Sequence, residues 1–122
     1  MFKSVREEER LISTALALSS LRKANYDPYK AISILREQAE KIKTAQTDDL
    51  ASQFARKATL KHLGKAEALI NRMISYVKER DQTVRTVYLE DLKSEFKGKV
   101  RDLKHTLKMI EGAINGLTRW LG

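Results

Sequence analysis

The last third of the sequence repeats apolar residues at steps of three and four positions, almost without interruption. Such steps return a residue to the same side of an α-helix, because the helix has about 3.6 residues per turn. Cations lie on one flank of this stripe and acids on the other. The pattern predicts one long amphipathic helix that ends near Trp120, and its core-facing residues are Leu89, Leu92, Phe96, Val100, Leu103, Leu107, Ile110, Ile114, Leu117 and Leu121.

Three further helices are predicted upstream. The first covers about residues 4–24 and begins with a serine and a glutamate at the S-x-x-E spacing of a capping box. Asp27 and Pro28 then suit the N-cap and the first position of the second helix, because Asp accepts free backbone N–H groups and Pro lacks one. The third covers about residues 48–80. Gly64 lies inside it, and glycine costs about 1 kcal/mol relative to alanine in a helix, so a kink or break there fits the pattern.

These elements predict an all-α fold, an antiparallel bundle of about four helices built on a long hairpin of the third and fourth helices. Residues 81–86 form the turn of that hairpin. With one Pro and five Gly, the chain has little of the turn chemistry that an all-β fold needs. A chain of 122 residues is long enough for one hydrophobic core, so residues 1–122 are predicted to form a single domain.

The uncharged segment Leu11–Leu21 presents leucines around more than half of the first helix. One neighbouring helix does not cover so wide a face. The segment is therefore predicted to lie either at the centre of the bundle or in an interface between subunits. It is too short for a membrane span, which takes about 20 apolar residues, so no transmembrane segment is expected.

The chain carries a formal net charge of +8 and contains no cysteine. The lack of thiols excludes disulfides, thiolate metal sites and cysteine catalysis, which suits a cytoplasmic location. The first ten residues include three adjacent glutamates and no apolar core of a signal peptide, which agrees with that location. An excess of positive charge on a folded surface favours an anionic partner, such as nucleic acid, an acidic protein or anionic lipid.

Basic residues recur at helical spacing on both arms of the predicted hairpin. Lys57, Lys61 and Lys65 stand at i, i+4 and i+8, so they form one column. The hairpin brings this column to the height of basic residues on the fourth helix. Such a group of cations fits a phosphate backbone, although solvated lysines along the edge of a core have the same spacing. The predicted nucleic-acid-binding residues are Lys57, Lys61, Lys65, Arg101, Lys104 and Lys108, and Arg56 and Arg72 extend the group.

Few residues suggest catalysis or metal binding. His62 lies on the apolar face of the third helix and His105 points away from the stripe of the fourth, so the two are not expected to share a metal ion. Arg56 and His62 have an R-x5-H spacing, which resembles the loose R-x4-6-H pattern of HEPN ribonucleases. Those enzymes are helical bundles whose Arg and His act on phosphate, so the resemblance implies a ribonuclease. Here Lys57 follows the Arg, and no other enzyme motif occurs, so we expect no enzyme, no cofactor and no metal.

The C-terminal end of the predicted fourth helix combines small and large residues. Gly112 and Gly116 form a G-x-x-x-G pair, a spacing that lets another helix approach closely. The fourth helix is also longer than the first two, so part of its stripe lacks a cover within the chain. Exposed apolar patches of this kind usually mark an interface. We therefore expect self-association through Gly112, Gly116, Leu117, Trp120 and Leu121.

These features predict a non-enzymatic basic helical protein that binds nucleic acid, DNA or RNA, through its phosphate backbone and assembles as an oligomer or nucleoprotein. The alternative is a protein–protein adaptor or small structural subunit whose basic face meets an acidic partner. A HEPN-like ribonuclease is the remaining alternative. Tyr26 and Tyr29, in the loop between the first two helices, either stack on bases or cap the core.

Overall fold

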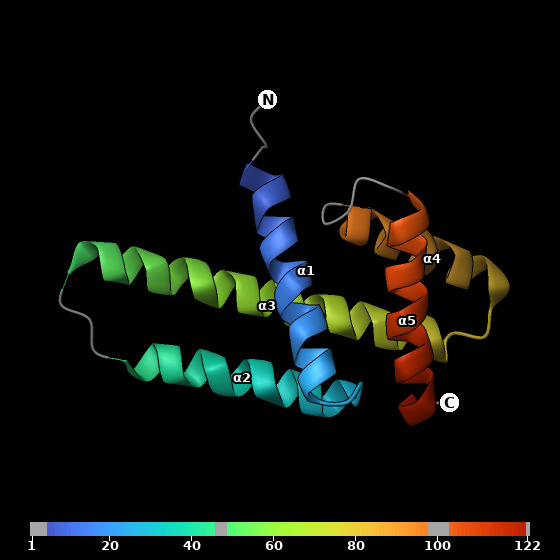
Figure 1. Cartoon of the computed structure of the whole chain (residues 1–122), viewed down its shortest axis with the longest axis horizontal. Helices are drawn as coiled ribbons and strands as arrows, with labels where there is room; N and C mark the ends of the chain where they lie inside the picture. Colours follow the sequence, from blue (N-terminus) through green and yellow to red (C-terminus); the bar gives the residue numbers. More distant parts are fainter. Residues whose placement is uncertain (1–4, 46–48, 98–102, 122) are drawn as a thin grey trace.

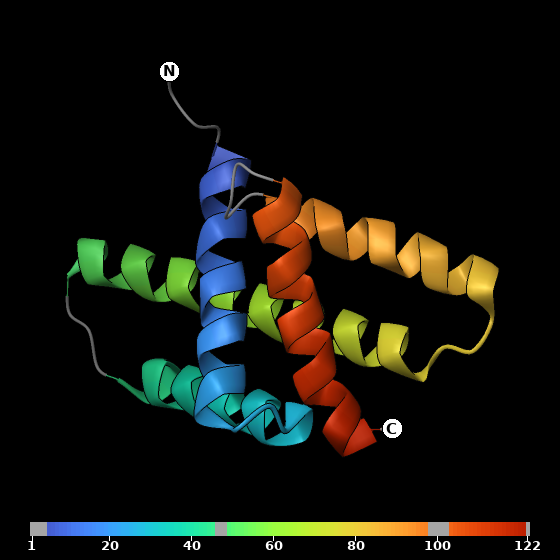
Figure 2. The same cartoon turned by 45° about the vertical axis from the view of Figure 1, so that its right-hand side comes forward.

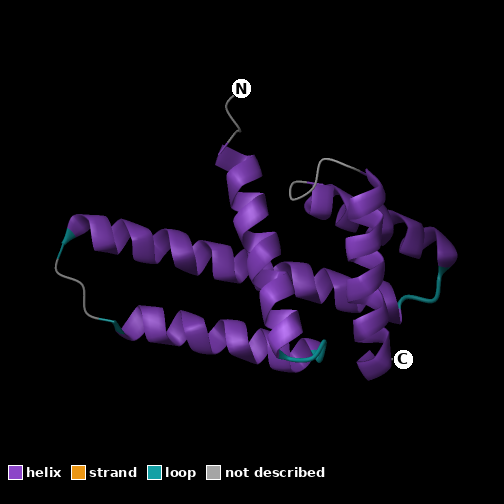
Figure 3. Cartoon of the chain, viewed as in Figure 1, coloured by secondary structure: helices purple, strands orange, loops and turns teal. Residues whose placement is uncertain are grey.

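The computed structural model describes residues 5–45, 49–97 and 103–121 (Figure 1). None of these residues forms a strand, which confirms the predicted all-α class (Figure 3). The described residues form five helices, which are α1 (Val5–Lys23), α2 (Pro28–Thr44), α3 (Leu50–Lys78), α4 (Gln82–Lys97) and α5 (Leu103–Leu121).

The helices form two layers. The antiparallel pair α2 and α3 runs along the length of the molecule, and α4 returns antiparallel beside the second half of α3 (Figures 1 and 2). Helices α1 and α5 cross over the same side of α3, and both run in the same direction (Figure 2). The first half of α3 therefore extends beyond the crossing helices, with only α2 beside it.

The predicted long fourth helix is divided into two helices in the structure, so the bundle has five helices and the hairpin of α3 and α4 is shorter than predicted. The structure has two helices here, α4 and α5, and α5 crosses α3 instead of continuing along it (Figure 1). Residues 98–102, between the two helices, lie outside the described residues. The sequence has Gly98 at this point, and glycine is among the residues least favourable to a helix interior. A separate α5 lays its apolar face across the core that α1 and α3 share.

The predicted apolar stripes mark the buried residues well. On α4 and α5, Leu92, Phe96, Ile110 and Leu117 are fully or almost fully buried. Within the segment Leu11–Leu21, the side chains of Ala17, Leu18 and Leu21 are buried in the core, whereas Ile12 is 44% exposed, so one face of this part of α1 contacts solvent. One continuous core joins all five helices and includes Ala17, Leu21, Ala31, Leu35, Leu63, Ala66, Leu69, Ile70, Met73, Leu92, Phe96, Ile110, Ala113 and Leu117.

The stripe on α3 fails at its first turns. Phe54, which the periodicity assigned to the core, is 64% exposed, and Leu50 is 67% exposed. The cause is the arrangement of the helices, since α1, α4 and α5 all pack along the later part of α3 (Figure 1). The outer end of the α2–α3 pair therefore carries large apolar side chains in contact with solvent.

Three aspartates start helices. Asp27 accepts the backbone N–H groups of Tyr29 and Lys30, as its predicted N-cap role requires. Asp49 caps α3, and the backbone N–H of Ser52, together with the Ser52 hydroxyl, lowers the pKa of the Asp49 carboxyl. Asp81 accepts the first N–H groups of α4, so this helix begins inside the segment predicted to be a turn.

Helix α3 continues through Gly64 without a break, and a Cβ atom added at Gly64 meets nothing within 4 Å. Gly64→Ala is expected to stabilise the protein by about 0.5–1 kcal/mol, because alanine loses less backbone entropy in a helix. At about 4 °C per kcal/mol for a chain of this length, Tm should rise by about 2–4 °C. Thermal unfolding followed by circular dichroism measures this shift, and a lower Tm would contradict the open surroundings of Gly64.

Candidate functional site

Lys57, Lys61 and Lys65 are all exposed and lie on the outward face of α3, opposite its buried residues. We call these three residues the α3 lysine column. At 1.5 Å of rise per residue, the column is about 12 Å long. Residues 50–66 of α3 contain no Asp or Glu, so every formally charged side chain in this stretch of the helix is basic. The column is therefore a strip of positive charge on a part of α3 that projects from the core.

Apolar side chains lie beside the α3 lysine column. Phe54 lies one turn before Lys57, on the same side of the helix. A hollow of about 400 Å³ adjoins these residues. Its walls combine an exposed aromatic ring and leucines with two cations, and the lining residues are Leu50, Gln53, Phe54, Arg56, Lys57 and Leu60.

The five described residues among the six predicted cations lie on two helices that cross, α3 and α5 (Figure 1). Lys104 and Lys108 are exposed on α5, whereas Arg101 lies outside the described residues. Helices α3 and α5 both bury apolar residues in the shared core, and their lysines at these positions are exposed. The predicted grouping depended on α5 running along α3, which it does not.

The acidic flank of α4 has a partner within the chain. Nη1 of Arg72 donates to Glu95 at 2.7 Å and to Asp91 at 3.2 Å. Burial lowers the pKa of Arg72, but the hydrogen bond and charge of Glu95 and the charge of Asp91 outweigh this effect and raise the pKa above its ordinary value. Arg56 donates to the backbone carbonyl of Ala45 at 2.9 Å. Both arginines predicted to extend the patch therefore have structural contacts.

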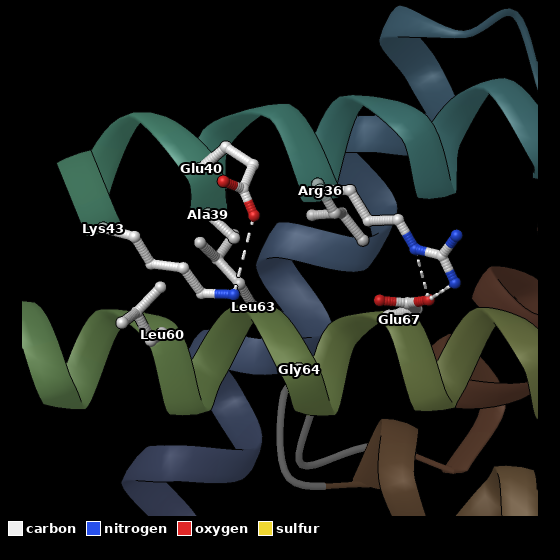
Figure 4. Close-up of a pocket in the computed structure, with 9 residues that line it drawn as sticks. Arg36, Ala39, Glu40, Lys43, Leu60, Leu63, Gly64 and Glu67 are labelled. Atoms are coloured by element: carbon white, nitrogen blue, oxygen red, sulfur yellow. Dashed lines mark hydrogen bonds and ion pairs between the residues drawn. The ribbon is translucent and has the colours of Figure 1, made fainter.

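The hollow between α2 and α3 has a volume of about 530 Å³, and its charges are balanced (Figure 4). Arg36 of α2 donates to Glu67 of α3 at 2.6 Å and 2.9 Å. Lys43 and Glu40, both of α2, form a second pair at 3.6 Å. Because each cation in this hollow has an acidic partner, it offers no excess charge for an anionic ligand.

Arg56 and His62 do not converge on a common site. Six residues apart on one helix, they are separated by about 120° around its axis. Nδ1 of His62 is buried without a hydrogen-bond partner, and Arg56 contacts the end of α2. His105 is exposed on α5. Across the described residues, no group of three or more His, Asp or Glu could hold a metal ion.

The close approach at Gly116 occurs within the chain. Gly116 is buried, and a Cβ atom added there would lie 2.5 Å from Cγ of Tyr26. Leu117 is also buried in the core, and Leu121 packs against it. Gly112 and Trp120 are the exposed members of the predicted self-association set. Self-association stays a prediction, and its predicted contact at Gly116 is occupied by Tyr26.

The turn between α1 and α2 adopts an unusual backbone. Asn25 and Tyr26 have φ angles of 54° and 65°, the left-handed region that non-glycine residues rarely enter. Helix α5 supports this turn, because Nε1 of Trp120 donates to the Asn25 carbonyl at 3.1 Å and Gly116 receives the Tyr26 ring. In the sequence, Gly116 indicated a close approach at this position, but nothing identified Tyr26 as the residue that approaches.

Comparison with known proteins adds no family. No protein-family model, curated protein or solved structure shows a significant match to this chain. No helix in the described part of the chain is both long enough and apolar enough to cross a membrane. The function is therefore inferred from the chemistry of the described surfaces.

Proposed function

We propose that this protein binds nucleic acid through the phosphate backbone, without catalysis, and that the α3 lysine column makes the main contacts. The observation that carries the proposal is the exposed column of Lys57, Lys61 and Lys65 in a stretch of helix without acids. Ammonium groups recognise phosphate as point charges and need no base-specific geometry. The expected binding is therefore insensitive to sequence and sensitive to salt.

Phe54 supports a preference for single strands. Its ring is 64% exposed and lies on the same side of α3 as Lys57 and Lys61. An aromatic ring beside a row of cations is the arrangement with which proteins stack unpaired bases while holding the backbone. Duplex DNA keeps its bases stacked internally, so it gains nothing from Phe54. We propose that single-stranded nucleic acid binds more tightly than a duplex of the same sequence.

A salt titration tests this proposal. Three phosphate contacts predict a slope of log K against log salt of about −2.1 for a single strand and about −2.7 for a duplex. If all six cations predicted from sequence contacted one duplex, the slope would be about −5.4. Fluorescence anisotropy with labelled oligonucleotides gives the binding constant at each of several salt concentrations between roughly 50 and 300 mM, and these constants give both slopes. Absence of salt-dependent binding to either oligonucleotide would reject the function.

The second candidate is binding of an acidic protein segment. The hollow lined by Leu50, Phe54 and Leu60, with Arg56 and Lys57 at its edge, favours it. An amphipathic helix places apolar anchors in such a groove and acidic residues against its cations. The absorbance ratio at 260 and 280 nm of the purified protein, before and after a high-salt wash, distinguishes the two candidates. Nucleic acid released by salt supports the first, and a protein that binds no oligonucleotide leaves the second.

A further inference from the structure

Helices α1 and α5 both cross α3 (Figure 2). Residues of these two helices line a small groove. Its volume is about 190 Å³. Two cations line it, one from each helix, together with one tyrosine, and no acidic residue is part of its wall. The lining residues are Leu18, Arg22, Tyr26, Lys108, Met109, Gly112 and Ala113.

The two cations of this groove lack partners. Within the described part of the chain, the side chains of Arg22 and Lys108 form no hydrogen bond and no ion pair. Three other described arginines have partners: Arg36 binds Glu67, Arg72 binds Asp91 and Glu95, and Arg56 binds a carbonyl. Two unpaired cations that line one cavity without an acid create a local excess of positive charge, which favours an anion.

The groove also offers a hydroxyl donor and open space. The Tyr26 hydroxyl makes no hydrogen bond among the described residues, and it is not a buried atom. Tyr26 is held in position by Gly116, so its ring is fixed before any ligand binds. Gly112 has nothing within 4 Å of the position of a Cβ atom, so the groove is open beside it.

We propose that the groove between α1 and α5 is a binding site for a phosphoryl group. The Arg22 guanidinium presents paired N–H donors that match two phosphoryl oxygens, and Lys108 adds a second positive charge. Tyr26 supplies a neutral donor, and Leu18 and Met109 provide apolar contact for whatever the phosphoryl group is attached to. A doubly charged phosphomonoester fits two unpaired cations better than a singly charged carboxylate does. This site does not include the α3 lysine column and does not depend on the proposed function.

Titration of the 15N-labelled protein with phosphoryl compounds tests the site. The probes are inorganic phosphate, a nucleoside 5′-monophosphate, and one short oligonucleotide with either a 5′-phosphate or a 5′-hydroxyl. We expect saturable shifts of the Gly112 and Tyr26 amide signals with at least one probe, at constant ionic strength. Saturation by the free compounds identifies a small-molecule site. Saturation that requires the 5′-phosphate of the oligonucleotide identifies a strand end.

Three variants define the result. The double variant Arg22→Gln, Lys108→Gln should bind the probe that saturates at least about tenfold more weakly, because both charge-assisted contacts are lost. Gly112→Leu keeps both charges but fills the groove, so it should have a similar effect. Arg119→Gln with Lys30→Gln removes the same charge elsewhere and should leave the affinity within about twofold.

The proposal is overturned if the shifts of Gly112 and Tyr26 do not saturate with any probe. It is equally overturned if the Arg22/Lys108 variant and the Arg119/Lys30 control bind alike. Substitution of all three lysines of the α3 column by Gln should leave the response to inorganic phosphate unchanged. Failure of this site and failure of the proposed function are therefore measured separately.

Discussion

Replacement of Gly116 by alanine is expected to destabilise the protein by about 2 kcal/mol. The new Cβ atom would lie 2.5 Å from Cγ of Tyr26 and 2.7 Å from its Cβ and Cδ1. These atoms are the base of the ring and not a flexible tip, so the whole Tyr26 side chain must move. Forced overpacking of this kind costs about 1–3 kcal/mol, and we expect a value at the upper end, less the gain in helix propensity. Tm should fall by about 8 °C.

Gly112→Ala is the matched control for this prediction. Gly112 lies one turn earlier on the same helix, and an added Cβ atom there meets nothing within 4 Å. Both substitutions gain the same helix propensity, about 0.5–1 kcal/mol, so the difference in unfolding free energy between the variants measures the clash with Tyr26. Urea unfolding gives both free energies. Equal stabilities of the two variants would contradict the contact between Gly116 and Tyr26.

A double-mutant cycle identifies the partner of Gly116. Tyr26→Gly removes all three atoms that a Cβ atom at position 116 would meet, and glycine tolerates the φ angle of 65°. In that background, Gly116→Ala should be neutral or slightly stabilising. The coupling energy between the two positions should then be about 2–3 kcal/mol, which is within the range for residues in contact. A coupling energy near zero would show that the cost arises elsewhere.

The sequence was sufficient to predict which residues are buried, but not how the helices turn. Leu92, Phe96, Ile110 and Leu117 are buried as predicted because burial follows the spacing of apolar residues. Residues 96 and 103 are seven positions apart, a step that fits one continuous helix and equally fits two helices whose apolar faces meet the same core. Phe54 was wrongly assigned to the core. The periodicity of apolar residues identifies one face of α3, but it does not show how far along α3 the neighbouring helices extend.

The candidate site shows the same limit. Lys57, Lys61 and Lys65 share a side because i, i+4 and i+8 do so on any helix, and this local prediction is confirmed. Their grouping with Lys104 and Lys108 was argued from one long fourth helix that runs along α3, and the structure has α4 and α5 there instead. Likewise, the spacing of Gly112 and Gly116 indicates that something approaches closely, but it contains no information that the approaching group is Tyr26, far away in the sequence.

Reversal of the α3 lysine column should abolish nucleic-acid binding. In the triple variant Lys57→Glu, Lys61→Glu, Lys65→Glu, each phosphate contact becomes a repulsion. We expect affinity to fall on the order of 100-fold or more at moderate salt and the salt slope to approach zero, since each lost contact reduces the slope by about 0.7–0.9. Anisotropy measurements on one single strand and one duplex should show the same loss for unrelated sequences.

A matched control separates a local site from net charge. Lys23, Lys30 and Lys41 are exposed on α1 and α2, and their reversal to Glu changes the net charge of the protein by the same amount. If attraction to the whole protein governed binding, both triple variants would lose affinity equally, because long-range attraction follows total charge. If the α3 lysine column holds the strand, the control keeps most of its affinity and nearly all of its salt slope, because the slope counts contacts and not distant charges. Equal losses in two variants that unfold at the wild-type temperature would therefore reject the column as the binding site.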